Sequence, residues 1–288
     1  MAAGSLDSAN ALHDGRRTLV TSDFPTRTAA RALGVPAEAI VSVEPVKHGL
    51  TNDSWLVRTQ TDAVIVRASN AAEEELRIDR ASEAAILRAV AAAGIGPEVL
   101  LCEPADRILV TRYAGTTWTQ EDALRLPNIE RLAGLLARLH ELEVPAGARQ
   151  VELISAIEGY LATLDRYQVQ TGLTSQPVRS RATEIAQELS RSSSARLCHN
   201  DVHHLNVVEA GELRLVDWEY AGAGEPLFDL ASACVYNGYD RVQREALLSA
   251  YAPGAGADMW RRLELACWLF EYIRDLWLAV RYRAPSSE

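Results

Sequence analysis

The hydrophobic pattern of this 288-residue chain changes its period once, near residues 113–117. Before that point the chain is rich in short runs of alternating apolar residues, many of them β-branched, which is typical of strands. After it, apolar residues recur at intervals of three and four, as on one face of a helix. The pattern therefore predicts an α+β fold in two lobes, with a five-stranded antiparallel sheet in the first and mainly helices in the second. The runs that predict strands are residues 39–46, 54–60, 62–69, 98–104 and 106–113.

This change of pattern divides the chain into four expected segments. They are a loose polar arm at 1–24, a first lobe at 25–112, a hinge at 113–117 and a helical second lobe at 118–288. In the first lobe, residues 78–94 predict a helix that begins at Asp79 and stops at Gly94, because aspartate caps helix starts and glycine ends helices. In the second lobe, residues 128–142 predict an amphipathic helix with a leucine-rich face.

Charge and composition exclude several kinds of partner. A net charge of −10 disfavours nucleic acid, whose backbone requires a basic surface. No apolar run approaches the ~20 residues that a membrane-spanning helix needs, and the first residues lack the basic and apolar segments of a secretory signal. The four cysteines are scattered, which is typical of reduced thiols. We therefore expect a cytoplasmic protein that binds neither nucleic acid nor membrane, while its oligomeric state is not indicated.

Three histidines, an aspartate and an asparagine are concentrated in the stretch LCHNDVHHLNVV, residues 197–208. Two kinds of chemistry would use such a cluster. One is a histidine-based metallohydrolase, which needs further histidines from elsewhere in the chain. The remaining ones are His13 in the polar arm, His48 in a loop and His140 near the end of a helix, so the supply is small. The other is a phosphoryl-transfer loop.

The spacing of the polar residues fits phosphoryl transfer better. Such a loop needs a carboxylate that accepts the proton of the acceptor hydroxyl, and amide and carboxylate oxygens that hold Mg²⁺. Asp201 and Asn206 stand five residues apart, and two short strands that turn at Gly211 then lead to Asp217. The end of a strand is a rigid position for a metal ligand. The stretch therefore predicts an ATP- and Mg²⁺-dependent phosphotransferase.

Three longer stretches extend this pattern. They are HGLTNDSWLV at 48–57, HNDVHHLN at 199–206 and LVDWEYAGAGEPLFDLA at 215–231. With them, the chain resembles the choline/ethanolamine kinase branch of the aminoglycoside-phosphotransferase and protein-kinase-like superfamily over residues 40–280. The resemblance implies a bilobal protein-kinase-like fold that transfers the γ-phosphoryl group of ATP to a hydroxyl acceptor.

The resemblance also implies roles for the residues of the second lobe. Asp201 would be the catalytic base, and Asn206 and Asp217 would hold Mg²⁺. Glu219 would assist the metal or orient its waters. Asp229 would brace the catalytic loop rather than touch the substrate.

The first lobe and the hinge are expected to bind the nucleotide. Arg67, on the third predicted strand, would grip phosphate oxygens with its guanidinium, and Glu83 on the following helix would pair with it. The remaining residues implied in nucleotide binding are Gly49, Thr51 and Asn52 in the loop after the first strand, and Arg112, Tyr113 and Ala114 at the start of the hinge, whose backbone would receive the adenine.

The acceptor is expected to be a small cation. Residues 199–229 hold seven acidic residues against Arg214 alone, which favours a cationic partner. Tyr220 and Trp277 would line the acceptor pocket, since aromatic faces bind quaternary ammonium groups. Arg274 lies on the same predicted helix face as Trp277 and would repel such a group, so we expect it to turn away.

The acceptor that this pattern favours is choline or ethanolamine. Three alternatives stay open at this point. The first is a kinase for thiamine, a sugar or an aminoglycoside. The second is a nucleotide-binding protein without catalysis, and the third is the histidine-based metallohydrolase.

Overall fold

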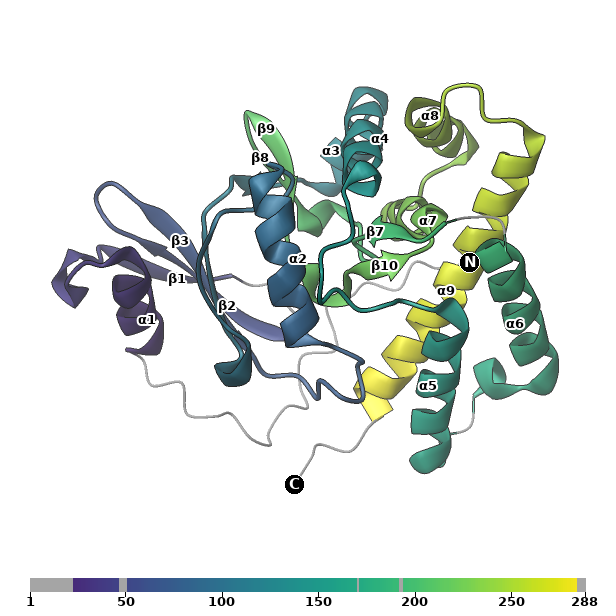
Figure 1. The fold of residues 1–288 in the computed structure, drawn as a ribbon, viewed down its shortest axis with the longest axis horizontal. Helices are drawn as coiled ribbons and strands as arrows, with labels where there is room; N and C mark the ends of the chain where they lie inside the picture. The colour runs from purple at the N-terminus through teal and green to yellow at the C-terminus, as the bar shows by residue number, and fades with distance from the viewer. Residues whose placement is uncertain (1–22, 47–50, 170, 192–193, 284–288) are drawn as a thin grey trace.

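The computed structural model describes residues 23–46, 51–169, 171–191 and 194–283. Its elements form a sheet-rich lobe and a mainly helical lobe (Figure 1), so the predicted α+β fold is confirmed. Most of the predicted arm and the predicted nucleotide-loop residue Gly49 lie outside the described residues. None of the helices in the described ranges is both long enough and apolar enough to cross a membrane.

The first lobe is built on one antiparallel sheet, in the strand order β1-β2-β3-β5-β4. Its strands are β1 (Ser42–Val46), β2 (Asn52–Arg58), β3 (Ala63–Ser69), β4 (Val99–Glu103) and β5 (Ile108–Arg112), and its helices are α1 (Phe24–Leu33) and α2 (Arg80–Ala92). Alternation along β3 sends Val64 and Val66 to one face, where they pack with Ala29 of α1 in a small core. Arg67 therefore points to the opposite face of the sheet.

Helix α2 connects the first lobe to the second. Asp79 caps the helix by accepting two backbone N–H groups over 3.0 Å, as the sequence predicted. The buried side chains of Ile86 and Leu87 belong to the large core of the second lobe, not to the small core beside α1. Glu83 is consequently carried by a helix that packs against both lobes.

Short strands of the second lobe flank the histidine-rich loop, residues 199–206. They are β6 (Thr116–Thr117), β7 (Arg196–Cys198), β8 (Val207–Ala210), β9 (Glu212–Leu215) and β10 (Gly222–Gly224). β6 pairs with β8 and β8 with β9, while β7 pairs with β10. Gly115 crosses close to this sheet with φ +125°, and a side chain there would collide with the backbone of Glu209. Residues 199–206 are thus fixed between β7 and β8, and Asp217 stands two residues after the end of β9.

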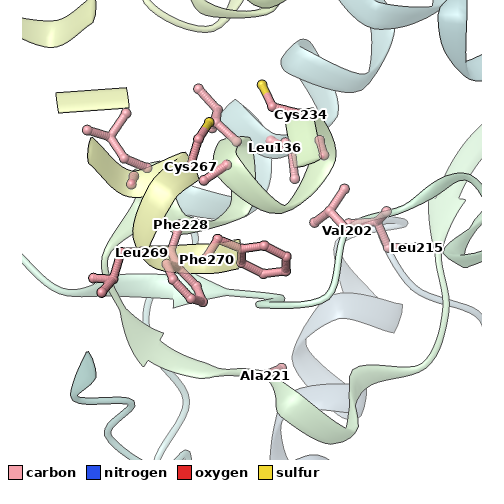
Figure 2. Close-up of a cluster of buried hydrophobic side chains, with 14 of the residues drawn as sticks. Leu136, Val202, Leu215, Ala221, Phe228, Cys234, Cys267, Leu269 and Phe270 are labelled. Atoms are coloured by element: carbon pink, nitrogen blue, oxygen red, sulfur yellow. The ribbon is translucent and has the colours of Figure 1, made fainter. Parts of the chain in front are cut away.

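Helices form the rest of the second lobe. They are α3 (Gln120–Leu124), α4 (Leu126–Glu141), α5 (Leu153–Arg166), α6 (Gln176–Arg191), α7 (Pro226–Asn237), α8 (Arg241–Tyr251) and α9 (Ala257–Arg283). Leu132 and Leu136 of α4 are buried, in agreement with their helical spacing. Figure 2 shows the core where α7 meets α9, in which the rings of Phe228 and Phe270 lie 5.0 Å apart. This packing fixes α7, which in turn supports the histidine-rich loop.

Candidate functional site

Two side chains of α7 hold the loop between β7 and β8. Asp229 accepts the His199 N–H with one carboxylate oxygen over 2.8 Å and the Asn200 N–H with the other over 2.6 Å. Ser232 accepts the Val202 N–H over 2.8 Å. Asn200 has φ +67°, a left-handed conformation that costs energy in any residue other than glycine. The bonds to Asp229 stabilise this conformation, which agrees with the expectation that Asp229 braces the loop.

The buried ring of His199 links two segments of the site. Its Nε2 lies 2.9 Å from the Val216 carbonyl oxygen, and its Nδ1 lies 3.3 Å from the Asp201 amide nitrogen. Because the carbonyl accepts and the amide donates, these partners assign the proton to Nε2. Burial lowers the pKa of His199, which favours this neutral form. Both ring nitrogens are therefore used in joining the loop to the residue before Asp217.

Asp201 is surrounded by hydrogen-bond donors. The Asn206 amide nitrogen lies 3.1 Å from Asp201 Oδ2, and the His203 Nε2 lies 3.6 Å from the same oxygen. The Tyr236 hydroxyl also interacts with this carboxylate. Burial acts to raise the pKa of Asp201, but the charge of His203 and these contacts outweigh it and keep the pKa below its usual range. The carboxylate is therefore ionised at neutral pH.

Asn206 and Asp217 lie on segments that are tied together. The Val216 N–H donates to the Asn206 carbonyl oxygen over 3.0 Å. The side-chain amide nitrogen of Asn206 donates to Asp201, and within the described residues its amide oxygen accepts no hydrogen bond. Burial and the Glu219 carboxylate raise the pKa of Asp217, and the charge of Arg67 opposes this shift. An amide oxygen and a carboxylate are the hard ligands that Mg²⁺ prefers, and these residues fit such an ion.

Arg67 contacts both lobes. Its Nη2 lies 2.6 and 2.7 Å from the two carboxylate oxygens of Glu83, and its Nη1 lies 3.1 Å from Asp217 Oδ1. The Arg67 and Glu83 side chains are only 11% and 3% exposed. The structure thus brings the expected partners together in a buried pair and places Asp217 beside them.

Thr51 and Asn52 bind the second lobe through Glu219. The Thr51 hydroxyl donates to Glu219 Oε1 over 2.6 Å, and the Asn52 amide donates to Oε2 over 2.9 Å. The Arg80 Nη1 lies 3.1 Å from Oε2. Thr51 and Asn52, which the sequence assigned to the nucleotide, therefore bind Glu219, which it assigned to the metal. Arg80, which the sequence analysis did not identify, joins them.

The hinge residues differ in their free backbone donors. The N–H groups of Arg112 and Tyr113 donate to the carbonyl oxygens of Glu98 and Ala63, both over 2.9 Å. The Arg112 side chain pairs with acidic neighbours in the first lobe. The Ala114 N–H makes no such backbone bond to any described residue. Of the three residues expected to receive adenine, Ala114 is the one with an available donor.

Tyr220 and Trp277 meet as expected of residues that share a pocket wall. The Trp277 indole N–H donates to the Tyr220 hydroxyl over 2.8 Å, and the rings are T-shaped with centroids 6.5 Å apart. Arg274 donates to Asp275 over 2.8 and 3.0 Å. The charge of Arg274 is therefore paired with the acidic residue that follows it.

Tyr236 is a site residue that the sequence analysis missed. Besides its interaction with Asp201, its ring packs edge-on against His203 at 5.1 Å and Phe270 at 5.2 Å. The residue is 37% exposed. The only signal in the sequence was an aromatic residue in the last turn of an apolar helix, and such residues are common in cores.

The loop histidines do not assemble a metal centre. His203 faces Asp201, and the His204 ring lies 3.1 Å from the Asn237 side-chain oxygen. In the part of the chain that the structure describes, one group has the spacing of metal ligands, and it consists of His140, Cys198 and Asp229. It includes neither His203 nor His204, so the geometry gives no support to a histidine-based metallohydrolase.

The chain is similar to known proteins along most of its length. The profile described as the phosphotransferase enzyme family (APH) matches residues 42–266. The thiamine kinase of Escherichia coli strain K12 is 29% identical over 255 residues, which cover 85% of each chain. The crystal structure of choline kinase LicA from Streptococcus pneumoniae superimposes with a TM-score of 0.75 at 20% identity, covering 92% of each chain. A choline/ethanolamine kinase family protein from Mesorhizobium loti gives 0.73 at 27% identity, covering 92% of this chain and 89% of that one.

Proposed function

The chain belongs to the phosphotransferase enzyme family and is a small-molecule kinase, and we propose that it transfers the γ-phosphoryl group of ATP to the hydroxyl of a small cationic alcohol. The expected resemblance to this superfamily and its fold is confirmed by the family match and the superimposed structures. One observation carries the proposal. The ionised Asp201 and the oxygens of Asn206 and Asp217 stand on two segments that are tied together, with Arg67 at Asp217.

We assign the role of general base to Asp201. Asn200, the residue before it, is already held in a left-handed conformation by Asp229 of α7, so the carboxylate needs little reorganisation before reaction. In the proposed step, the acceptor oxygen bonds to the γ-phosphorus, the bond from that phosphorus to ADP breaks, and the hydroxyl proton moves to Asp201. His203 and Tyr236 would keep the carboxylate oriented toward the acceptor.

Asn206 and Asp217 are the residues that we assign to hold Mg²⁺. Their amide and carboxylate oxygens form a donor set suited to this ion. When bound, the ion would neutralise negative charge on the phosphate oxygens. Glu219, the third expected ligand, already accepts hydrogen bonds from the first lobe with both of its oxygens.

The nucleotide would be held by the first lobe and the hinge. Arg67 presents a planar guanidinium that matches phosphate oxygens, and Glu83 fixes its orientation. Ala114 would receive the adenine through its free N–H. Gly49, Thr51 and Asn52 are still predicted to form the nucleotide-binding loop.

A cationic alcohol suits the acceptor side of the site. Tyr220 and Trp277 present joined aromatic rings, and the Asp201 charge acts on the Tyr220 hydroxyl. Such rings attract cations by roughly 0.5–2 kcal/mol, and the nearby Asp201 carboxylate attracts them further. Choline and ethanolamine, which the sequence favours, carry a positive nitrogen near a hydroxyl. Thiamine, which the Escherichia coli relative is named for, has the same two features, so the proposal covers this class.

A screen of ATP consumption tests the proposal. The purified chain, ATP and Mg²⁺ are incubated with choline, ethanolamine, thiamine, sugars and aminoglycosides, and with 3,3-dimethylbutan-1-ol as the neutral isostere of choline. We expect at least one cationic alcohol to be phosphorylated, and the neutral isostere to be a much poorer acceptor. Phosphorylation of sugars alone would contradict the acceptor class, while ATP binding without any turnover would contradict catalysis.

A further inference from the structure

A series of alternating charges connects the two lobes beside the proposed site. Its contacts are Asp217–Arg67 at 3.1 Å, Arg67–Glu83 at 2.6 Å, Glu83–Arg80 at 2.8 Å and Arg80–Glu219 at 3.1 Å. The two ends, Asp217 and Glu219, belong to one short segment of the second lobe, whereas the other members belong to the first lobe. This ion-pair ring therefore crosses between the lobes twice, once through Arg67 and once through Arg80.

Glu219 is one of the two ends of the ion-pair ring, both of which the sequence assigned to the metal. Its Oε1 accepts from Thr51, and its Oε2 accepts from Asn52 and lies beside Arg80. The side chain is only 2% exposed. A buried carboxylate needs a charged partner and hydrogen bonds to both oxygens, and side chains of the first lobe supply all of these.

Arg80 is the most connected member of the ion-pair ring. Its side chain is only 7% exposed, and its partners are Asn52, Ser69, Glu73, Glu83 and Glu219. Through Glu83 it reaches the carboxylate that orients Arg67, and through Asn52 it reaches the start of β2, next to the predicted nucleotide loop. One side chain thus contacts both nucleotide-binding parts of the first lobe and also the second lobe.

We propose that Arg80 and Glu219 are positioning residues that fix Thr51, Asn52 and Arg67 against the segment that carries Asp217, and that Glu219 is not a metal ligand. The inference rests on the proposed kinase function. Removing one member of a buried pair leaves the other charge unpaired, so this contact between the lobes is weakened. ATP binding should then weaken because the first lobe is no longer held in place, while the requirement for Mg²⁺ stays the same.

A double-mutant cycle with Glu219→Gln and Arg80→Met tests this. ATP binding is measured by calorimetry with Mg²⁺ and with EDTA, and stability by urea unfolding. Each single variant should weaken ATP binding by roughly tenfold in both conditions. The double variant should be no weaker than the worse single variant, because both changes remove the same contact. The acceptor KM should stay at the wild-type value, which a general loss of structure would not allow.

Glu73→Gln is the matched control, because it removes a partner of Arg80 that lies within the first lobe. This variant should bind ATP like the wild type. Two outcomes would overturn the inference. One is that Glu219→Gln weakens ATP binding only when Mg²⁺ is present and Arg80→Met has no effect, which would make Glu219 a metal ligand. The other is that the losses of ATP-binding free energy in the two single variants add up in the double variant.

A failure of the proposed kinase function can be distinguished from a failure of the roles proposed for Arg80 and Glu219. A wild-type chain that consumes no ATP with any acceptor contradicts the proposed function. The binding and unfolding cycles still measure whether Arg80 and Glu219 act as one unit, because neither measurement requires turnover.

Discussion

The Nε2 atom of His199 lies 2.9 Å from the carbonyl oxygen of Val216. This bond joins the start of the loop that carries the proposed base to the residue before the proposed metal ligand Asp217. The same ring also accepts the Asp201 N–H, and its face packs on Trp218 with ring centroids 4.6 Å apart. The buried side chain of His199 therefore fixes the position of the proposed base Asp201 relative to the proposed metal ligand Asp217.

We predict that His199→Phe will destabilise the fold and slow phosphoryl transfer. Phenylalanine fills a similar volume but leaves the Val216 carbonyl and the Asp201 amide unpaired. Each buried group left without a partner costs about 1–3 kcal/mol. The free energy of unfolding, measured in urea, should fall by an amount in this range or above it. An unchanged value would show that the two segments are held by other contacts.

The same residue predicts a pH dependence of stability. Burial lowers the pKa of folded His199 below the ~6.5 of an unfolded histidine. Between these two values the unfolded chain binds a proton that the folded chain does not, so the stability due to His199 falls as the pH drops through about 6.5. The gap in unfolding free energy between wild type and His199→Phe should therefore narrow from about pH 7.5 to about pH 5.5. Other titrating groups are common to both proteins, so a constant gap would contradict the prediction.

Asp201→Asn should lower turnover by about 10²–10⁴-fold, the usual contribution of a positioned general base. The amide keeps the shape of the carboxylate but does not accept the proton. ATP affinity, measured by calorimetry, should stay near the wild-type value because Asp201 is assigned to the acceptor side. Turnover close to that of the wild type would remove Asp201 from the mechanism.

Asp217→Ala should change nucleotide binding as well as turnover. In the wild type we expect Mg²⁺ to strengthen ATP binding, and EDTA to abolish transfer. Without the Asp217 carboxylate, ATP binding should no longer respond to Mg²⁺, since one of the two assigned ligands is missing. Calorimetric titration of ATP at several Mg²⁺ concentrations measures this. A variant that still responds to Mg²⁺ like the wild type would contradict the assignment.

The elements that local sequence controls were predictable. Alternation placed Val64 and Val66 on one face of β3, and helical spacing placed Leu132 and Leu136 in the core. The loop of the proposed site could also be selected from sequence, because the proposed chemistry requires Asp201 and Asn206 to stand close together along the chain.

The contacts between lobes were not predictable in this way. Arg80 lies in the first turn of a helix, where an arginine is usually exposed, and nothing local indicates that Glu219 reaches it from the other lobe. Tyr236 depends in the same way on how α7 packs against α9. Such pairings follow from tertiary structure, and a single sequence carries no signal for them.

The last prediction concerns the charge of the acceptor and depends on Arg274. An unpaired guanidinium about 4 Å from a cationic acceptor would repel it by about 4 kcal/mol at an effective dielectric near 20. That would exceed the roughly 0.5–2 kcal/mol that an aromatic contact supplies. Arg274 donates hydrogen bonds to Asp275 through two nitrogens, which pairs its charge, and the remaining field acts on the Tyr236 hydroxyl.

We therefore expect Arg274→Ala to change the KM of a cationic acceptor only slightly, and the double variant with Asp275→Ala serves as the charge-matched control. Tyr220→Ala and Trp277→Ala should each raise that KM by about two- to thirtyfold, the equivalent of one cation–π contact. Tyr220→Phe should do less, because it keeps the ring and loses only the hydroxyl that binds the Trp277 N–H. The preference for choline over its neutral isostere should decrease in Tyr220→Ala and Trp277→Ala, because the aromatic rings attract only the charged acceptor. If Arg274→Ala instead abolished the use of an anionic or neutral acceptor, the cationic class would be wrong, while the assignments of Asp201 and Asp217 would stand.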